Sequence, residues 1–292
     1  MNPPPRHLRP LSLPATLAAL VSLSGPMAAQ SAGSAVVREQ AAYAEWLATA
    51  PNSPLAAVAQ QPIGPGIRLG PQDADVPLEG VAEHRVTERG GLVTLEGPGG
   101  SRALPPGRPV ALGSHFIASG GVPRRRVLTV YGPKGNGEPA GFYRYDPRLV
   151  FTGPMSPPDR PGAVRVLALD GVETEAAEAG TVAVPVGGRS VRLRVRRIPT
   201  GAEDESELEI YFRDGTNGEG TYPAGRFVPL EPLSDGRYRL DFNRARNPFC
   251  AYSSAFPCPA PWRGNTIGAK VEAGERYLGG GLSAPPAGLE AR

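Results

Sequence analysis

Two short segments carry most of the side chains that could do chemistry in this 292-residue chain. The first, 211–230, interrupts strand-like sequence with glycines and polar residues, and the second, 240–267, holds both cysteines. Their polar side chains are the candidate ligand-binding residues: Asp214, Thr216, Tyr222, Arg226, Asp241, Asn243, Arg244 and Asn247. Residue types alone assign no catalytic residue, so whether the protein is an enzyme stays open at this point.

Three interpretations of the two segments differ in the role that they give to Arg226. Its guanidinium offers five donors in a fixed fork, and a carboxylate can accept two of them. We expect a pair with Asp241 in preference to Asp214, which would join the two segments. A second interpretation is that Arg226, Tyr222 and Asn243 present themselves to a small anionic or peptidic ligand. A third is a hydrolase in which Asp214 and Asp241 divide the work of acid and base while Arg226 holds an oxyanion.

Several polar residues of these segments have a structural interpretation. Asn243, Asn247 and Asn265 lie in proline-punctuated sequence, where amide side chains commonly satisfy backbone groups. Asp214 and Thr216 follow a predicted strand and precede glycines, so they can bond nearby backbone in a turn. Both features predict rigid loops.

The two cysteines predict a disulfide rather than a metal site. Cys250 and Cys258 enclose a short loop, and in an oxidising compartment a bond between them is the default. Closing so short a loop stabilises by roughly 2–3 kcal/mol in the chain-entropy model. A zinc site needs more nitrogen or sulfur ligands, and only His84 and His115 lie outside the N-terminal region. We therefore expect neither a metal nor a cofactor.

Short strings in the two segments are similar to those of a known family. They are Tyr211–Thr216 (YFRDGT), Thr221–Phe227 (TYPAGRF), Leu240–Ala245 (LDFNRA), Asn247-Pro248, Cys250-Ala251-Tyr252, Cys258-Pro259, Pro261 and Asn265. The pattern resembles the family catalogued as domain of unknown function 1684, whose members are often bacterial and exported. The resemblance is most specific over residues 205–275 and weaker around Asp146-Pro147 and the N-terminal helix. That family has no established activity, so the resemblance implies no mechanism.

The N-terminus predicts export. Basic residues at Arg6 and Arg9 precede an apolar run, 11–23, and small residues end at Ala29, which is the pattern of a cleaved signal peptide. Cleavage after Ala29 would start the mature chain near Gln30, in the periplasm or outside the cell, without a membrane span. The formal charge of +3 then falls to +1 as Arg6 and Arg9 leave. So small a charge argues against nucleic-acid binding.

Composition and pattern predict an all-β protein with one short helix. Gly 38 and Pro 35, with only 7% aromatic residues, favour many short strands joined by turns. Apolar spacing predicts a helix from Ser34, as N-cap, to Ala48, which Pro51 would stop. Short apolar runs between glycines predict a β-sandwich. These runs are 67–69, 76–78, 85–87, 92–95, 109–112 and 127–131.

The sandwich sequence faintly resembles a forkhead-associated domain. The resemblance rests on residues 75–78, which precede His84 and a strand. Leu69 and Val81 stand where that family has its phosphate-gripping arginine and serine, so we do not expect phosphopeptide binding. His84 is interpreted as a structural histidine.

The second half predicts a charged hairpin. Apolar residues alternate with Arg192, Arg194 and Arg196 in one strand and with Glu207 and Glu209 in the next. We expect the arginines to form an outward row balanced by the glutamates across the pair.

Together these patterns give the domain organisation. A signal peptide (1–29) is followed by the helix and a linker (30–60), and then by a forkhead-associated-like sandwich (61–132). A second β domain with the disulfide loop (133–278) and a flexible tail (279–292) complete the chain. The sequence leaves the oligomeric state undetermined.

Overall fold

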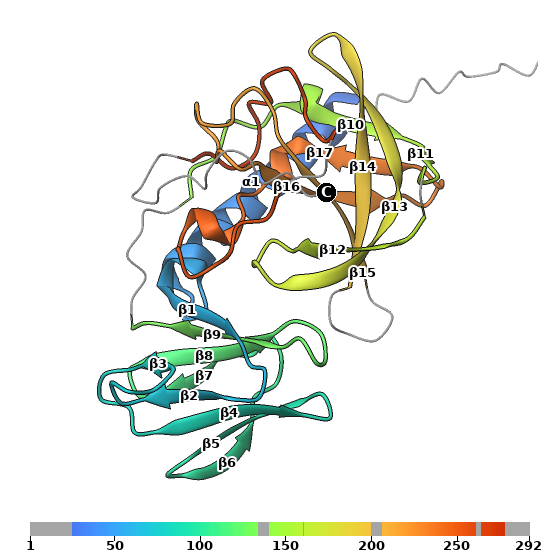
Figure 1. Ribbon diagram of the computed structural model, residues 1–292. Helices are drawn as coiled ribbons and strands as arrows, with labels where there is room; N and C mark the ends of the chain where they lie inside the picture. Colours follow the sequence, from blue (N-terminus) through green and yellow to red (C-terminus); the bar gives the residue numbers. More distant parts are fainter. Residues whose placement is uncertain (1–24, 134–139, 160, 200–205, 261–263, 278–292) are drawn as a thin grey trace, which may run out of the picture.

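The computed structural model describes residues 25–133, 140–159, 161–199, 206–260 and 264–277. Within these ranges the protein is predominantly β, with one N-terminal α-helix and several sheets (Figure 1). The all-β prediction is confirmed. Most of the predicted signal peptide and the predicted tail, 279–292, lie outside the described residues.

The first β unit is a two-layer sandwich. One sheet has the strand order β3-β2-β4-β5-β6 and the other β1-β9-β8-β7. The strands are β1 (Ala57–Pro62), β2 (Ile67–Gly70), β3 (Val76–Pro77), β4 (His84–Arg89), β5 (Leu92–Gly97), β6 (Gly100–Ala103), β7 (Val110–Leu112), β8 (His115–Gly120) and β9 (Val127–Tyr131). Apolar residues of both sheets, among them Leu69 and Leu95 of one and Ile117 and Val130 of the other, form one core.

The six predicted strands of this unit are present, and three more were missed. β1, β6 and β8 contain Gln-Gln, Gly-Ser-Arg and Ala-Ser-Gly stretches that lack the apolar alternation by which strands are recognised. The Nδ1 atom of His84 lies 2.7 Å from the Ala82 carbonyl oxygen, a local structural contact. The resemblance to forkhead-associated domains stays a prediction.

The second unit is one long antiparallel sheet that curls toward a barrel (Figure 1). Its order is β10-β17-β16-β15-β14-β13-β11, and β12 also pairs with β13. The strands are β10 (Val150–Gly153), β11 (Met155–Ser156), β12 (Ala163–Leu167), β13 (Glu173–Val186), β14 (Arg189–Pro199), β15 (Ser206–Phe212), β16 (Arg226–Pro232) and β17 (Tyr238–Asp241). Short 3-10 turns are η1 (Pro54–Ala56), η2 (Pro147–Leu149), η3 (Phe242–Arg244) and η4 (Phe249–Ala251). The inner face buries a core that includes Leu193, Ile210, Val228 and Phe242.

The segment around the disulfide lies at the contact between the two β units. Cys250 and Cys258 are bonded, as predicted. The segment packs in a cluster with Ala57 and Tyr131 of the sandwich, and the Ser253 hydroxyl donates to the Ala57 carbonyl over 2.8 Å. The disulfide segment, which we expected to contribute to a ligand site, therefore mainly connects the two β units.

The disulfide segment also explains why the predicted arginine row is only partly outward. Arg192 is exposed and Arg194 half-buried, but Arg196 is only 1% exposed. Its guanidinium donates to the Ala260 carbonyl and lies over the Tyr211 ring, because residues 249–260 cover this part of the outer face.

The predicted charge balance across the β14–β15 pair is also mostly wrong. The register places Arg196 opposite Glu209. Arg194, however, binds Glu178 of β13 through two hydrogen bonds, and Arg192 approaches Asp159. Both of these acids belong to other parts of the chain than β15, so the neutralisation is local but comes from different partners.

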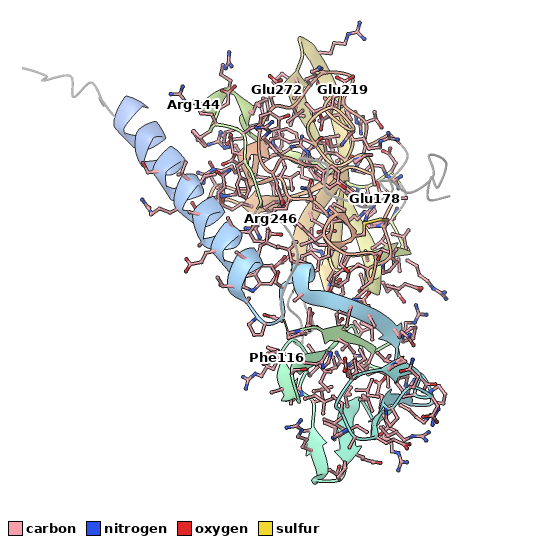
Figure 2. The ribbon with its side chains drawn as sticks, turned by 90° about the vertical axis from the view of Figure 1, so that its left-hand side faces the viewer. Phe116, Arg144, Glu178, Glu219, Arg246 and Glu272 are labelled. Carbon is pink, nitrogen blue, oxygen red and sulfur yellow. A yellow bond between two sulfur atoms is a disulfide. The ribbon has the colours of Figure 1, made fainter. Side chains whose placement is uncertain are left out.

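The helix α1 (Gly25–Thr49) is longer than predicted and lies along the second unit (Figure 2). Ser34 falls inside it, so the predicted N-cap is wrong, whereas the end before Pro51 is as expected. Several of its side chains reach the second unit, among them Glu39, Tyr43 and Trp46. Glu39 pairs with Arg244, Tyr43 stacks under Arg246, and Trp46 lies 6.2 Å from the Phe249 ring.

Candidate functional site

Arg226 and Asp214 form a fully buried ion pair. The two groups are 2.8 Å apart, and both side chains are 0% exposed. Gly225 makes the geometry possible, because its φ of 114° suits glycine and a Cβ there would lie 2.6 Å from the Phe212 carbonyl oxygen. The guanidinium also donates to the carbonyls of Val271 and Ala273. Arg226 thus ties β16 to the C-terminal segment.

The predicted preference for Asp241 as the partner is wrong, and the strand register is the reason. Arg226 stands opposite Phe212, so Asp214 lies just beyond it at the turn of the same hairpin. Leu230 stands opposite Leu240, which places Asp241 about three residues, or roughly 10 Å, along β16 from Arg226. Asp241 instead caps η3 by accepting from the backbone and side chain of Asn243.

Most of the other predicted site residues are structural and buried. Thr216 donates to the Asp214 carboxylate, and the Tyr222 hydroxyl lies 3.2 Å from the Cys258 sulfur. Asn243 bridges to the backbone of Asp146, and Asn247 donates to the Arg276 carbonyl. Asn265 likewise joins β14 to β15 by donating to both backbones. The prediction that the asparagines satisfy backbone groups is confirmed.

The acid and base of the hydrolase hypothesis do not face a common cleft. The Asp214 carboxylate accepts from Arg226, from Thr216 and from the Val271 amide, and it is closed to solvent. Asp241 is 5% exposed and is used as a cap. Neither carboxylate is placed to exchange protons with a substrate.

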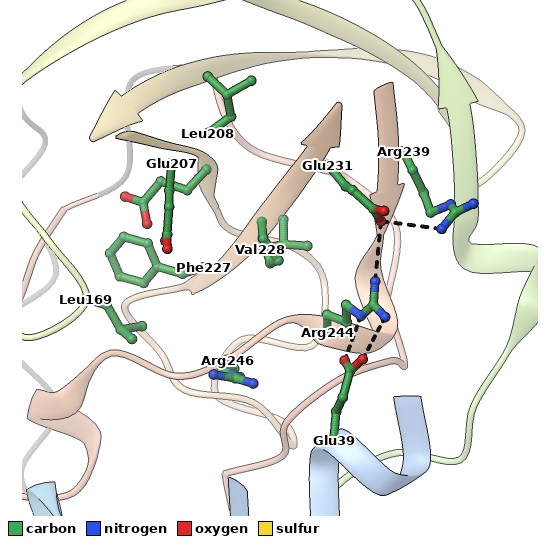
Figure 3. Close-up of a pocket in the computed structure, with 12 residues that line it drawn as sticks. Glu39, Leu169, Glu207, Leu208, Phe227, Val228, Glu231, Arg239, Arg244 and Arg246 are labelled. Atoms are coloured by element: carbon green, nitrogen blue, oxygen red, sulfur yellow. Dashed lines mark hydrogen bonds and ion pairs between the residues drawn. The ribbon is translucent and has the colours of Figure 1, made fainter. Parts of the chain in front are cut away.

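Of the predicted residues, Arg244 borders an open cleft. The cleft has a volume of about 540 Å³ and lies on the outer side of β15, β16 and β17 (Figure 3). Its lining residues are Glu39, Leu169, Glu207, Leu208, Glu209, Phe227, Val228, Pro229, Glu231, Arg239, Arg244 and Arg246. A volume of this size is typical of small-ligand sites.

One end of the cleft is a chain of ion pairs. Arg244 donates both Nε and Nη2 to the Glu39 carboxylate of α1, at 2.9 and 3.0 Å. It also lies 3.6 Å from Glu231, which in turn accepts from Arg239 over 3.3 Å (Figure 3). Two arginines thus meet two glutamates, and this end of the cleft is neutral.

Arg246 is the one arginine of the cleft lining that is not paired with a glutamate among the described residues. Its guanidinium makes no hydrogen bond and no ion pair within the described ranges, and Figure 3 draws it in the cleft without a dashed contact. It stacks instead on Tyr43 of α1, 4.2 Å from the ring centroid. A cation held on an aromatic face keeps its hydrogen-bond donors available.

The opposite end of the cleft carries two acids of β15. Glu207 is exposed, whereas Glu209 is half-buried, and its Oε1 atom is buried with no hydrogen-bond partner in the described part of the chain. Burial raises the pKa of Glu209 to about 7, although nearby Arg196 lowers it. A carboxyl group with this pKa changes its charge near neutral pH.

A second unusual acid lies behind Arg246. Glu275 is 0% exposed, and its Oε2 atom accepts from the Asn247 amide over 2.9 Å. Its Oε1 atom has no partner among the residues described here. Burial raises the pKa of Glu275 to about 8, against the lowering influence of the Asn247 amide and of Arg246 and Arg226.

Sequence reasoning missed Arg246, although a signal for it existed. Arg244 and Arg246 alternate in the string NRARN, directly after a predicted strand, so both were candidates to lie on one side of an extended segment. Glu207 and Glu209 were placed correctly on the charged face of β15, but they were assigned to the neutralisation of arginines. What the sequence does not show is the position of α1, which brings Glu39 to the cleft.

The fold and this cleft define a class of protein: a two-unit β protein with a charged cleft on the outer face of its second sheet. Residues 139–276 match the model of a family described as protein of unknown function (DUF1684), and the chain belongs to this family.

A solved structure is similar to this chain as well. It is the solution NMR structure of an uncharacterized protein from gene locus rrnAC0354 of Haloarcula marismortui. It is 34% identical, over 48% of this chain and 76% of that chain, with a TM-score of 0.41. A search of curated proteins found no match.

The described residues contain no group of three or more His, Cys, Asp or Glu side chains arranged to hold a metal ion. No helix among them has both the length and the apolar character needed to cross a membrane.

Proposed function

We propose that this protein is a binding protein whose cleft holds a small ligand by an anionic group on Arg246. The observation that carries the proposal is the guanidinium of Arg246, which lines the cleft and has no ion pair or hydrogen bond within the described ranges. Every other arginine that lines the cleft pairs with a glutamate. An arginine fork suits the planar geometry of a carboxylate or the oxygens of a phosphate.

The surroundings of Arg246 support binding. Tyr43 supports the guanidinium from one side by stacking, so the group is oriented before a ligand arrives. Leu169, Phe227 and Pro229 add apolar surface for the body of a ligand.

The geometry favours binding over hydrolysis by the predicted aspartates. Asp214 and Asp241 are engaged in structural contacts, as described above, and the Arg226 guanidinium is closed to solvent. The polar cluster expected to present a ligand site therefore stabilises the fold, and the site we propose lies beside it.

The test is a thermal-shift titration with benzoate, succinate and inorganic phosphate as probes. We expect at least one probe to raise the Tm of the wild type, because a ligand that binds only the folded state stabilises it. A charge-assisted hydrogen bond contributes about 1.5–3 kcal/mol, so Arg246→Met should weaken binding by roughly 10- to 150-fold. Arg246→Lys, which keeps the charge but not the fork, should bind with intermediate strength.

Arg237→Met is the matched control, since Arg237 pairs with Asp235 on the surface and does not line the cleft. It should bind each probe like the wild type. Equal binding by the wild type and by folded Arg246→Met would overturn the proposal, and so would the failure of all three probes.

We further propose that the protein acts outside the cytoplasm, after cleavage near Gln30. The support is the basic, apolar and small-residue sequence up to Ala29. Intact-mass measurement of the protein recovered from the periplasm or the medium should give a chain that begins near Gln30. A chain that retains Met1, or that is found only in the cytoplasm, would contradict this.

A further inference from the structure

We infer that the ligand of the cleft is dipolar, with a carboxylate on Arg246, an ammonium group on Glu209 and Glu207, and an apolar body between them. The inference rests on the proposed function and deepens it. The chemistry is that of an α-amino acid or of a short peptide with a free amino group.

The first step is the unpartnered oxygen of Glu209. Glu209 lines the cleft, and its Oε1 atom is buried and has no hydrogen-bond partner among the described residues. A buried carboxylate oxygen without a partner is costly, because it has lost water and gained nothing. A donor brought by a ligand would remove that cost.

The second step is the identity of that donor. Glu207 and Glu209 are two residues apart on β15, so their side chains lie on the same face of the strand. Glu207 adds a second, exposed negative charge near the first. Two neighbouring acids favour a cationic donor, and an ammonium group offers three hydrogens to share between them.

Arg196 does not take this place. It stands opposite Glu209 in the β14–β15 register, yet its guanidinium is turned under residues 249–260. Burial raises the pKa of Glu209, the positive charge of Arg196 lowers it, and Glu207 and Asp170 raise it further, so that the pKa is about 7. An incoming ammonium group would favour the charged form of Glu209.

The third step is the charge balance of the whole cleft. Arg239, Arg244, Glu39 and Glu231 neutralise one another at one end. The groups that remain are Arg246 and the two acids of β15. They carry opposite charge, so a ligand of a single sign would pair with one and leave the other without a partner. A dipolar ligand satisfies both.

The wall between the charged groups is apolar. Phe227 and Pro229 of β16 belong to this wall, and Leu169 borders it from the loop before β13. A volume of about 540 Å³ accommodates an aromatic or aliphatic side chain together with both polar groups.

The experiment is isothermal titration of the full chain with four related probes. L-Phenylalanine and the dipeptide Phe-Phe carry both charges, and they separate a free amino acid from a peptide as the source. N-acetyl-L-phenylalanine lacks the ammonium charge, and L-phenylalaninamide lacks the carboxylate. We expect one of the dipolar probes to bind at least tenfold more tightly than either blocked compound.

Two variants locate the interaction. Glu209→Gln should reduce the affinity for the dipolar probe by about tenfold or more but should not reduce that for N-acetyl-L-phenylalanine, since this anionic probe gains nothing from the negative charge of Glu209. Glu219→Gln is the matched control, because Glu219 is an exposed partner of Lys270 outside the cleft. It should bind every probe like the wild type.

The outcomes separate the two claims. If N-acetyl-L-phenylalanine binds as tightly as the dipolar probes, and Arg246→Met abolishes that binding, the dipolar inference is overturned and the proposed function stands. If the amide alone binds, through Glu209, the proposed role of Arg246 is overturned. If no probe binds, both fail for this ligand class.

Discussion

Arg226→Met is expected to lower the free energy of unfolding of the second β unit by about 3–5 kcal/mol, the usual cost of leaving one member of a buried ion pair without its partner. The substitution leaves the Asp214 carboxylate at 0% exposure without its countercharge. It also removes the donors to the carbonyls of Val271 and Ala273. Urea unfolding followed by circular dichroism measures the change.

A double-mutant cycle assigns the cost to the pair. Asp214→Asn alone should be strongly destabilising, and the double variant should lose much less than the sum of the two single losses, because neither charge is then left alone. Arg237→Met is the control, since its pair with Asp235 has side chains 56% and 49% exposed. Such an exposed pair contributes little to stability, because solvent screens it. A similarly small loss of stability for Arg226→Met, or a coupling energy near zero, would contradict a stabilising role of the buried Arg226–Asp214 pair.

Glu275→Gln is expected to be neutral below about pH 5 and stabilising near pH 8. The pKa of Glu275 is raised from 4.5 to about 8 in the folded protein, chiefly by burial. The folded state therefore binds a proton that the unfolded state has released between these values. Stability from this group is fully present below pH 4.5 and is lost as pH rises through about 8. Glutamine mimics the protonated form and has no such loss.

The measurement is urea unfolding of both proteins at several pH values from about 4.5 to 8.5, compared as a difference. One such group changes the difference by at most about 1.4 kcal/mol per pH unit. Glu209, with a raised pKa of about 7, acts in the same direction but cancels in the comparison. Glu219→Gln, an exposed control, should follow the wild type. Parallel curves for Glu275→Gln and wild type would mean that Glu275 is ionised throughout.

Local sequence patterns predict many of the strands. They do not predict the strand register, that is, which residues stand opposite each other in paired strands. Alternating apolar residues and glycine-rich turns predicted both strands of the β14–β15 pair. They could not show that Arg226 stands opposite Phe212, which decides its partner. The same limit explains the wrong prediction for Arg196, whose place in the alternating pattern is that of an exposed side chain. It is buried because a distant segment, 249–260, folds over that face.

The cleft depends on a still longer-range arrangement. Glu207 and Glu209 come from β15, Arg246 from the segment after η3, and Tyr43 and Glu39 from a helix about 200 positions earlier in the chain. From its neighbours in the sequence alone, each of these residues is predicted to be an ordinary surface or helix residue. Only the packing of α1 against the second unit brings them to one place (Figure 2).

The most direct test of the proposed site observes the Arg246 side chain itself while a ligand binds. In protein labelled with ¹⁵N-arginine, the Nε–H resonance of Arg246 is identified by its absence in Arg246→Lys. The titrant is whichever of benzoate, succinate or phosphate raises the Tm most. The account predicts that the Arg246 resonance shifts with the occupancy of the site while that of buried Arg226 stays in place. A fixed Arg246 resonance, with shifts confined to Arg226 or to arginines of the sandwich, would contradict it.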